Sequence, residues 1–201
     1  MEDSYVDLRR MFCSGEQELK RFRQLVVNAV MATDIMDKEL GLQRKARWNK
    51  AFSDEIAMEG PRPSQEEDVN RKATIVIEHL IQASDVAHTM QHWHVYKKWN
   101  GLLFEELYRA YKEGRSEKDP AEAWYQGEIG FFDFYIIPLA KKLKNCGVFG
   151  VSSAECLSYA RQNRQEWVAK GQDVVAELIE KVSKDYTHVS ASCVGEENVL
   201  V

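Results

Sequence analysis

The stretch from Arg71 to Trp99 constrains the fold of this chain more than any other. Its first part places apolar residues three and four positions apart, which is the spacing of one face of an α-helix. Further apolar residues widen this face until little polar surface is left, as is typical of a helix buried on several sides. The face consists of Ala73, Val76, Ile77, Leu80, Ile81 and Ser84, widened by Ile75, Val86 and Ala87.

One carboxylate, Asp85, interrupts this apolar run, and His88, His92 and His94 follow it. Because an unpaired buried carboxylate costs free energy, we expect Asp85 to need a cation, a metal ion or strong hydrogen-bond donors. Asp85, His88 and His92 have spacings that can face one metal ion if the helix continues, whereas His94 lies off this stripe. The alternatives are a buried salt bridge for Asp85, and histidines that cap a helix end or face solvent.

The composition is that of an ordinary globular protein with one sizeable core. A net charge of -5 and scattered basic residues exclude a basic surface for nucleic acid. No apolar run approaches the roughly 20 residues that span a bilayer, and the N-terminus lacks the pattern of a secretory signal. The 4 cysteines form no CxxC pair, which is typical of reduced thiols, so we predict a cytoplasmic location.

Helical periodicity recurs along most of the chain, and neither a strand pattern of useful length nor an internal repeat is present. We therefore predict an all-α fold. Capping boxes at Ser64 and Ser152, each with a glutamate three residues later, mark two helix starts. The predicted helices cover residues 16–33, 42–52, 64 to about 92, 93 to about 114 (with Val95, Trp99, Leu102, Leu103, Leu107 and Tyr111), an aromatic segment that Pro138 kinks or divides, and 152 to about 182.

The same periodicity suggests the domain bounds. Residues 1–15 form an N-terminal segment without a clear period, and residues 16–182 form one domain. Residues 183–201 lose all periodicity and are predicted to be a disordered tail.

Three stretches, taken in order, resemble the C-terminal half of the catalytic domain of class I cyclic nucleotide phosphodiesterases. Residues 32–36, ATDIM, are similar to the family's Thr-Asp-Met-like motif. Residues 83–87, ASDVA, are similar to its Ala-Asp-(Ile/Leu/Val)-Ser motif, and Tyr96 with Trp99 to the Tyr-x-x-Trp downstream. Residues 128–134, EIGFFDF, ahead of a proline, are similar to its Gln-(Val/Ile)-Gly-Phe-Ile-Asp motif. The order and intervals agree over residues 16–182.

This resemblance implies a multi-helix bundle that hydrolyses a 3′,5′-cyclic nucleotide to the 5′-monophosphate in signal transduction. In the family, two divalent metals, usually zinc with magnesium or manganese, are held by two histidines and two aspartates. A metal-bridging hydroxide attacks the cyclic phosphate, and a histidine protonates the leaving O3′.

The resemblance also implies roles for individual residues. Asp85 matches an aspartate that binds the first metal. Phe131 matches the aromatic clamp on the purine ring, and Ile129 lies near it. Three further residues match positions that line the pocket, while Ile35 stands where the family has its methionine and Met36 falls one residue later. The three lining residues are Tyr96, Trp99 and Leu103.

The sequence departs from the family's pattern in three places. Nothing matches the upstream His-Asn-x-x-His and His-Asp motifs, so we expect no catalytic residue in this chain and one metal ligand, Asp85. Glu128 replaces the glutamine that reads the purine; because a carboxylate only accepts, it suits guanine better than adenine and favours cyclic GMP. His88 replaces an asparagine and is expected at the pocket rim.

Several alternatives stay open at this stage. The chain is expected to be either a truncated phosphodiesterase domain or an inactive helical remnant that acts as an interaction module. A self-contained zinc-binding helical domain built on Asp85, His88 and His92 is the third reading. The expected partner is a cyclic nucleotide; homodimerisation, and a membrane anchor carried on domains outside this chain, are left open.

Overall fold

The computed structural model describes residues 5–7, 11, 13–35, 37–52 and 64–194, with side chains placed up to residue 184. These residues form helices and turns without any strand among them, so the predicted all-α fold is confirmed. The chain divides into two compact units, Met1–Asp85 and Val86–Val201. The domain bounds predicted at residues 16 and 182 remain a prediction.

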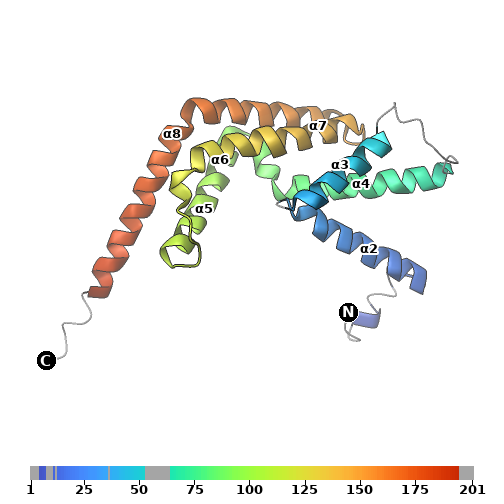
Figure 1. Cartoon of the computed structure of the whole chain (residues 1–201), viewed down its shortest axis with the longest axis horizontal. Coiled ribbons are helices and arrows are strands. Elements are labelled where there is room, and N and C mark those ends of the chain that lie inside the picture. The colour runs from blue at the N-terminus through green and yellow to red at the C-terminus, as the bar shows by residue number, and fades with distance from the viewer. Residues whose placement is uncertain (1–4, 8–10, 12, 36, 53–63, 195–201) are drawn as a thin grey trace. The chain divides into compact units, whose positions relative to one another are not determined.

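The first unit is built from three helices, α2 (Glu16–Thr33), α3 (Lys38–Phe52) and α4 (Gln65–Asp85). Helices α2 and α3 both pack against α4; Figure 1 draws α2 and α3 in blue and α4 in green. Helix α3 begins four residues earlier than the periodicity predicted, because the Asp37 carboxylate caps it by accepting from the backbone N–H groups of Glu39 and Leu40 at 2.9 and 3.0 Å. The loop predicted at residues 53–63 lies outside the described residues.

The capping box at the start of α4 is confirmed. The Glu67 carboxylate accepts from the backbone N–H of Ser64 at 2.9 Å, and the Ser64 hydroxyl accepts from the backbone N–H of Glu67 at 3.2 Å. These reciprocal bonds satisfy donors that a helix start otherwise leaves open.

The face that α4 buries is not the one that the apolar periodicity predicted. Its apolar stripe lies open, with Ile77, Leu80 and Ile81 exposed by 42%, 43% and 37%. The prediction of a helix buried on several sides is therefore wrong. The buried residues are instead Ile75, Glu78, His79, Gln82 and Ala83.

The second unit contains the 3-10 helix η2 (Ala87–Met90), α5 (Trp93–Lys112), the 3-10 helix η3 (Pro120–Glu122), α6 (Trp124–Phe131), the π-helix η4 (Phe132–Ile136), α7 (Ile137–Asn145) and α8 (Gly150–Val194). Pro138 falls in the first turn of α7, where its missing N–H costs little. The sequence predicted that Pro138 kinks or divides this segment. In the structure, η4 separates α6 from α7 just before this proline.

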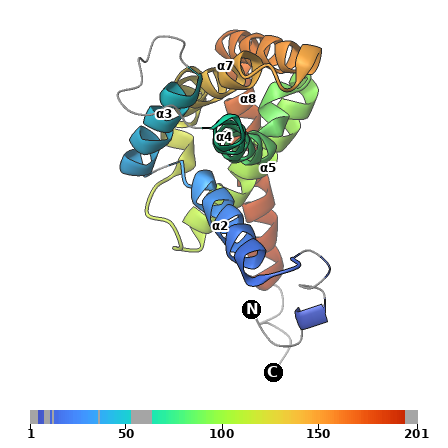
Figure 2. The ribbon, with the colours of Figure 1, turned by 90° about the vertical axis from the view of Figure 1, so that its right-hand side faces the viewer.

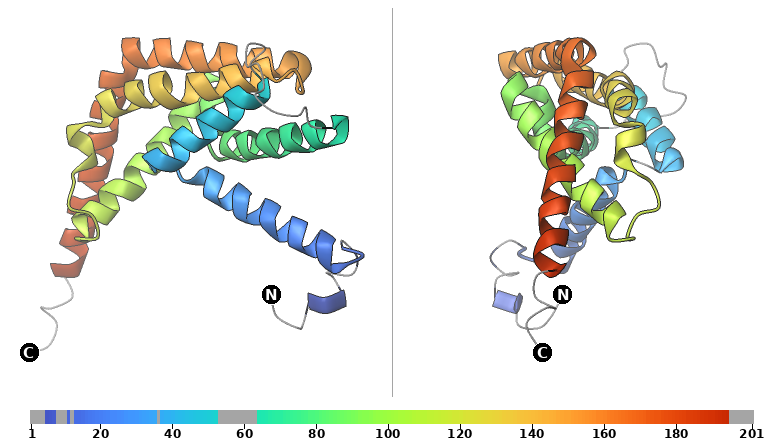
Figure 3. Two further views of the ribbon diagram at one scale, coloured as in Figure 1. Left: turned by 45° about the vertical axis from the view of Figure 1, so that its right-hand side comes forward. Right: turned by 90° about the vertical axis from the view of Figure 1, so that its left-hand side faces the viewer.

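Helix α8 is the long element of the second unit. It packs against α7, α6, η2 and α5. Figure 1 shows it bent, and Figure 2 shows its first part beside α7. Figure 3 shows its second part beside α5. The helix continues to Val194, so the predicted end near Val182 is too early.

Aromatic side chains form the core of the second unit. Tyr96, Phe104, Phe132 and Trp167 are fully buried. Gly171 leaves the space that the Trp167 indole occupies, because a Cβ atom at this glycine would lie 2.9 Å from two atoms of the indole ring.

Helix α5 buries a stripe of residues spaced four apart, namely Tyr96, Asn100, Phe104 and Tyr108. Most of the apolar residues in the predicted helical pattern lie on its open side. Among them, Trp99, Leu102, Leu103 and Leu107 are 40–52% exposed. Within the described part of the chain, every helix is too short or too polar to cross a lipid bilayer.

Candidate functional site

Asp85, the predicted metal ligand, is the last residue of α4 and is exposed. The inference that it is buried in an apolar run is wrong, because the apolar face of α4 is itself exposed. Its carboxylate has no ion-pair partner among the described residues. An exposed carboxylate is fully hydrated and needs no partner to be stable, so the burial argument for a ligand at Asp85 no longer holds.

The histidines after Asp85 do not continue its helix. His88 lies in η2, His92 is the N-cap residue of α5, and His94 lies in the first turn of α5. The His92 Nε2 atom lies 3.1 Å from the Tyr159 hydroxyl. Over the described ranges, no three His, Cys, Asp or Glu side chains gather so that they could hold a metal ion. The helical spacing on which a self-contained zinc site depended is therefore absent.

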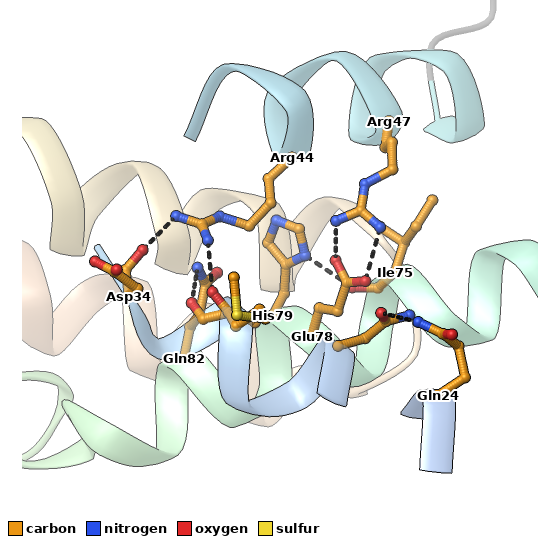
Figure 4. Close-up of polar contacts among 11 residues, drawn as sticks. Gln24, Asp34, Arg44, Arg47, Ile75, Glu78, His79 and Gln82 are labelled. Atoms are coloured by element: carbon orange, nitrogen blue, oxygen red, sulfur yellow. Dashed lines mark hydrogen bonds and ion pairs between the residues drawn. The ribbon is translucent and has the colours of Figure 1, made fainter. Parts of the chain in front are cut away.

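The turn that holds Ile35 is fixed by side chains from α3 and α4. The Gln82 amide donates to the Ala32 carbonyl at 2.8 Å. The Arg44 guanidinium donates to the carbonyls of Met31 and Asp34 at 3.1 and 2.9 Å (Figure 4). These donors satisfy carbonyls that the end of α2 leaves without helical partners. Ile35 is 39% exposed beside this turn, and Met36 lies outside the described residues.

The polar residues that α4 buries are individually satisfied. The Glu78 carboxylate, 2% exposed, accepts hydrogen bonds from both Nη atoms of Arg47 at 2.8 and 2.7 Å (Figure 4). His79 Nδ1 lies 2.8 Å from the Ile75 carbonyl oxygen, and because a carbonyl can only accept, this nitrogen is the donor. The His79 ring packs against Trp48 with centroids 4.5 Å apart. This face of α4 therefore serves packing within the first unit.

In the second unit, two predicted substrate-binding residues from different motifs meet. The Tyr96 hydroxyl donates to Glu128 Oε2 at 2.6 Å. Tyr96 is fully buried, and Glu128 is half-buried on α6. The bond fixes one carboxylate oxygen of Glu128 against α5.

Two residues that the sequence analysis did not single out lie next to this contact. Asn100 lies one turn after Tyr96 on the buried stripe of α5. The Trp124 indole Nε1–H donates to Asn100 Oδ1 at 3.1 Å. A signal for Asn100 was present: it is the one polar residue at four-residue spacing among Tyr96, Phe104 and Tyr108.

Burial and hydrogen bonding act in opposite directions on Glu128. Burial raises the pKa of the Glu128 carboxyl group, while the bonds from Tyr96 and Asn100 partly offset this by favouring the ionised form. The pKa of the Tyr96 phenol is raised strongly, first by burial and then by the neighbouring carboxylate. Tyr96 therefore stays protonated and is available as a donor.

A second pair of predicted residues also lies together. The rings of His88 and Trp99 have centroids 6.4 Å apart. Burial lowers the pKa of His88, which favours a neutral imidazole. Leu103 lies one turn after Trp99 on the same open side of α5.

The predicted purine clamp lies at the junction of α6 and η4. Phe131 is half-buried and stacks on Tyr135 with ring centroids 5.4 Å apart. Ile129 is half-buried two residues before it. The π-helix that follows is tied to α8, because Arg164 donates to both carboxylate oxygens of Asp133 at 3.0 and 2.8 Å.

Helix α8 also fixes the segment that carries His88. Asn163, fully buried, donates to the carbonyls of Thr89 and Gln91 at 3.0 and 2.7 Å. No local pattern indicated this contact, because Asn163 lies in an ordinary amphipathic pattern and its partners are more than 70 residues away.

Comparison with known proteins identifies the family. A family model described as 3′5′-cyclic nucleotide phosphodiesterase matches residues 7–149, which is more than half of the chain. A search of curated proteins and a search of solved structures each returned no match. On the strength of the family match, the chain belongs to the 3′5′-cyclic nucleotide phosphodiesterase family.

Proposed function

We propose that this chain forms the purine-binding side of a class I cyclic nucleotide phosphodiesterase domain. The domain would hydrolyse a 3′,5′-cyclic nucleotide to the 5′-monophosphate as part of signal transduction. The family match over residues 7–149 is the observation that carries this proposal. The contact between Tyr96 and Glu128, which joins two of the motifs behind the resemblance, supports it.

The metal chemistry of the family is only partly represented among the described residues. Asp85 is the proposed ligand, and an exposed carboxylate is a suitable donor for zinc, magnesium or manganese. The described residues do not fit a two-metal site by themselves, since they hold no group of three or more candidate ligands. We therefore propose that the metal centre and the general acid come from sequence other than these residues.

The base-binding side follows from the chemistry of Glu128. A carboxylate accepts hydrogen bonds, and the guanine edge offers the N1–H and N2–H₂ donors, whereas adenine N1 accepts. Glu128 thus favours cyclic GMP over cyclic AMP. Phe131 is the proposed clamp on the purine ring. The remaining lining residues in this proposal are Ile129, His88, Tyr96, Trp99, Leu103 and Ile35.

A second candidate function is that of a helical interaction module without catalysis. The exposed apolar residues of the first unit favour it, because large apolar surfaces on soluble proteins commonly pack against another protein segment. On α2, Val26, Val27, Val30 and Met31 are 44–63% exposed, in addition to the open apolar stripe of α4.

A fusion experiment separates the two candidates. The chain is joined behind the N-terminal half of a class I phosphodiesterase catalytic domain, which supplies the other ligands, and hydrolysis of both cyclic nucleotides is measured. We expect hydrolysis that Asp85→Asn abolishes and that the matched change Asp173→Asn, at an exposed site on α8, leaves intact. A fusion that folds, with this chain packed against the N-terminal half, but that hydrolyses neither nucleotide would favour the interaction module.

A further inference from the structure

Helices α7 and α8 form a groove that none of the proposed nucleotide-binding residues lines. Lys144 of α7 and residues between 154 and 165 of α8 line it, and Figures 2 and 3 show α7 beside this part of α8. The groove has a volume of about 440 Å³, within the range of roughly 300–1,000 Å³ that is usual for small-molecule sites. Apart from Lys144, its lining lies outside residues 7–149, which the family model matches.

The lining combines an apolar part with hydrogen-bonding groups. Leu157, which is 5% exposed, and Ala154 supply the apolar part. The Ser158 hydroxyl and the side-chain amides of Gln162 and Gln165 supply groups that can both donate and accept. A small molecule that has both a polar and an apolar portion matches such a lining.

The charged groups of the groove are all positive. Lys144 and Arg161 line it, and no aspartate or glutamate among the described residues does so. The whole chain carries a net charge of -5, so this excess of positive charge is local. The groove therefore favours an anion.

The two cations of the groove are also free to bind a ligand. No carboxylate in the described part of the chain pairs with Arg161 or with Lys144. Every other described basic side chain of α8 does form an ion pair, so Arg161 stands apart on its own helix. The paired residues are Arg164, Lys170, Lys181 and Lys184.

We propose that this groove binds the phosphate monoester group of a small phosphorylated molecule, with Arg161 and Lys144 as charged donors and the organic part beside Leu157. A guanidinium presents its N–H groups in a fork that matches phosphate oxygens, and a phosphate monoester carries nearly two negative charges at neutral pH. The groove is larger than a phosphate ion needs, which leaves room for an organic part. This site goes beyond the proposed function and does not depend on it, since the two share no residue.

The first test adds ribose 5-phosphate to the full 201-residue chain. Calorimetry measures its affinity, and the backbone amide signals of residues 154–165 in NMR spectra show where it binds. The probe has no base, so the proposed contacts of Glu128 and Phe131 cannot hold it. We expect saturable binding that shifts these signals, no binding of ribose, which lacks the phosphate, and weaker binding of inorganic phosphate, which lacks the organic part.

The second test removes one positive charge at a time. Arg161→Gln and Lys144→Gln should each weaken the binding of ribose 5-phosphate by about fivefold to tenfold, because each removes a charge-assisted contact. Lys170→Gln is the matched control, since it removes the same charge from an exposed site of α8 outside the groove. All three side chains are exposed, so the variants should fold like the wild type, which circular dichroism checks.

The outcomes that would overturn the inference are specific. One is the absence of saturable binding of ribose 5-phosphate, and another is an unchanged affinity in both Arg161→Gln and Lys144→Gln. An equal loss in Lys170→Gln would attribute binding to the general charge of α8 and not to the groove. Equal affinities for inorganic phosphate and ribose 5-phosphate would overturn the role given to the apolar part. Phe131→Ala should leave this binding unchanged, so the result does not depend on whether the proposed function holds.

Discussion

Helices α4 and α5 use their faces in opposite ways. In the first unit, α4 buries Glu78, His79 and Gln82 and leaves Ile77 and Leu80 exposed. In the second unit, α5 buries a stripe that is aromatic apart from Asn100.

The difference shows that partners, as well as hydrophobicity, decide which face a helix buries. Each buried polar side chain of α4 has a partner that it can meet only in this orientation, such as Arg47 for Glu78 and the Ala32 carbonyl for Gln82. On α5, the one polar residue of the buried stripe, Asn100, is satisfied by the indole N–H of Trp124.

The largest expected effect tests the buried stripe of α5. Phe104→Ala should lower the free energy of unfolding by about 3–5 kcal/mol, because it removes a fully buried ring and leaves a cavity. Leu102→Ala, on the open side of the same helix, is the control and should change stability by less than about 0.5 kcal/mol. Urea unfolding followed by circular dichroism measures both. Equal losses for the two variants would mean that the faces of α5 are assigned incorrectly.

The next effect tests the buried polar face of α4. Arg47→Ala leaves the Glu78 carboxylate buried without its ion-pair partner, which should cost about 1–3 kcal/mol, a range reduced because Arg47 itself is half exposed. Urea unfolding followed by circular dichroism measures the change. Lys45→Ala, at an exposed position of α3, is the matched control. If Arg47→Ala and Lys45→Ala lose the same free energy of unfolding, the pairing of Arg47 with Glu78 is contradicted.

A smaller, pH-dependent effect is expected where η4 meets α8. The hydrogen bonds from Arg164 hold the pKa of Asp133 below its usual value. A lowered folded-state pKa stabilises the fold above the ordinary carboxyl pKa, and this stabilisation is lost as the pH falls through the lowered value. Asp133→Asn should therefore cost at most about 1 kcal/mol at neutral pH and nothing in strong acid. Thermal unfolding of the wild type and of Asp133→Asn from neutral pH to strong acid measures this loss of stability. A loss that persisted in strong acid would contradict the prediction.

The smallest effect is expected on the open apolar stripe of α4. Leu80→Ser should change the stability of the isolated chain by less than about 0.5 kcal/mol, since its side chain is 43% exposed. In the fusion described above, the same change should cost more if another segment packs on this stripe. A large loss already in the isolated chain would place Leu80 in a core and remove the contrast between α4 and α5.

The sequence predicted the all-α fold and the order of the main helices, because periodicity and the capping box at Ser64 are local signals. It assigned the faces of α4 and α5 incorrectly, because apolar spacing does not reveal which polar residues will find partners. The ion pair between Arg47 and Glu78 spans 31 residues and cannot be inferred from local pattern.

The candidate site was predicted by resemblance more than by pattern. The resemblance gave Tyr96 and Glu128, which the structure joins by a hydrogen bond. The burial argument for Asp85 failed because it assumed that the apolar stripe around it is covered. Asn100 and Trp124 could not be connected from sequence, since their contact depends on how α6 packs near α5.

The π-helix η4 has a consequence for how this segment can change. Its wider turn holds one residue more than an α-helix needs for the same rotation. Deleting one residue from 132–136 would therefore restore an ordinary helix while the residues before and after it keep nearly their present directions. Phe131 and the buried Leu139 would then keep their present surroundings together. At this point the molecule should tolerate the loss of one residue better than an ordinary α-helix does, where a deletion rotates one side against the other by about 100°.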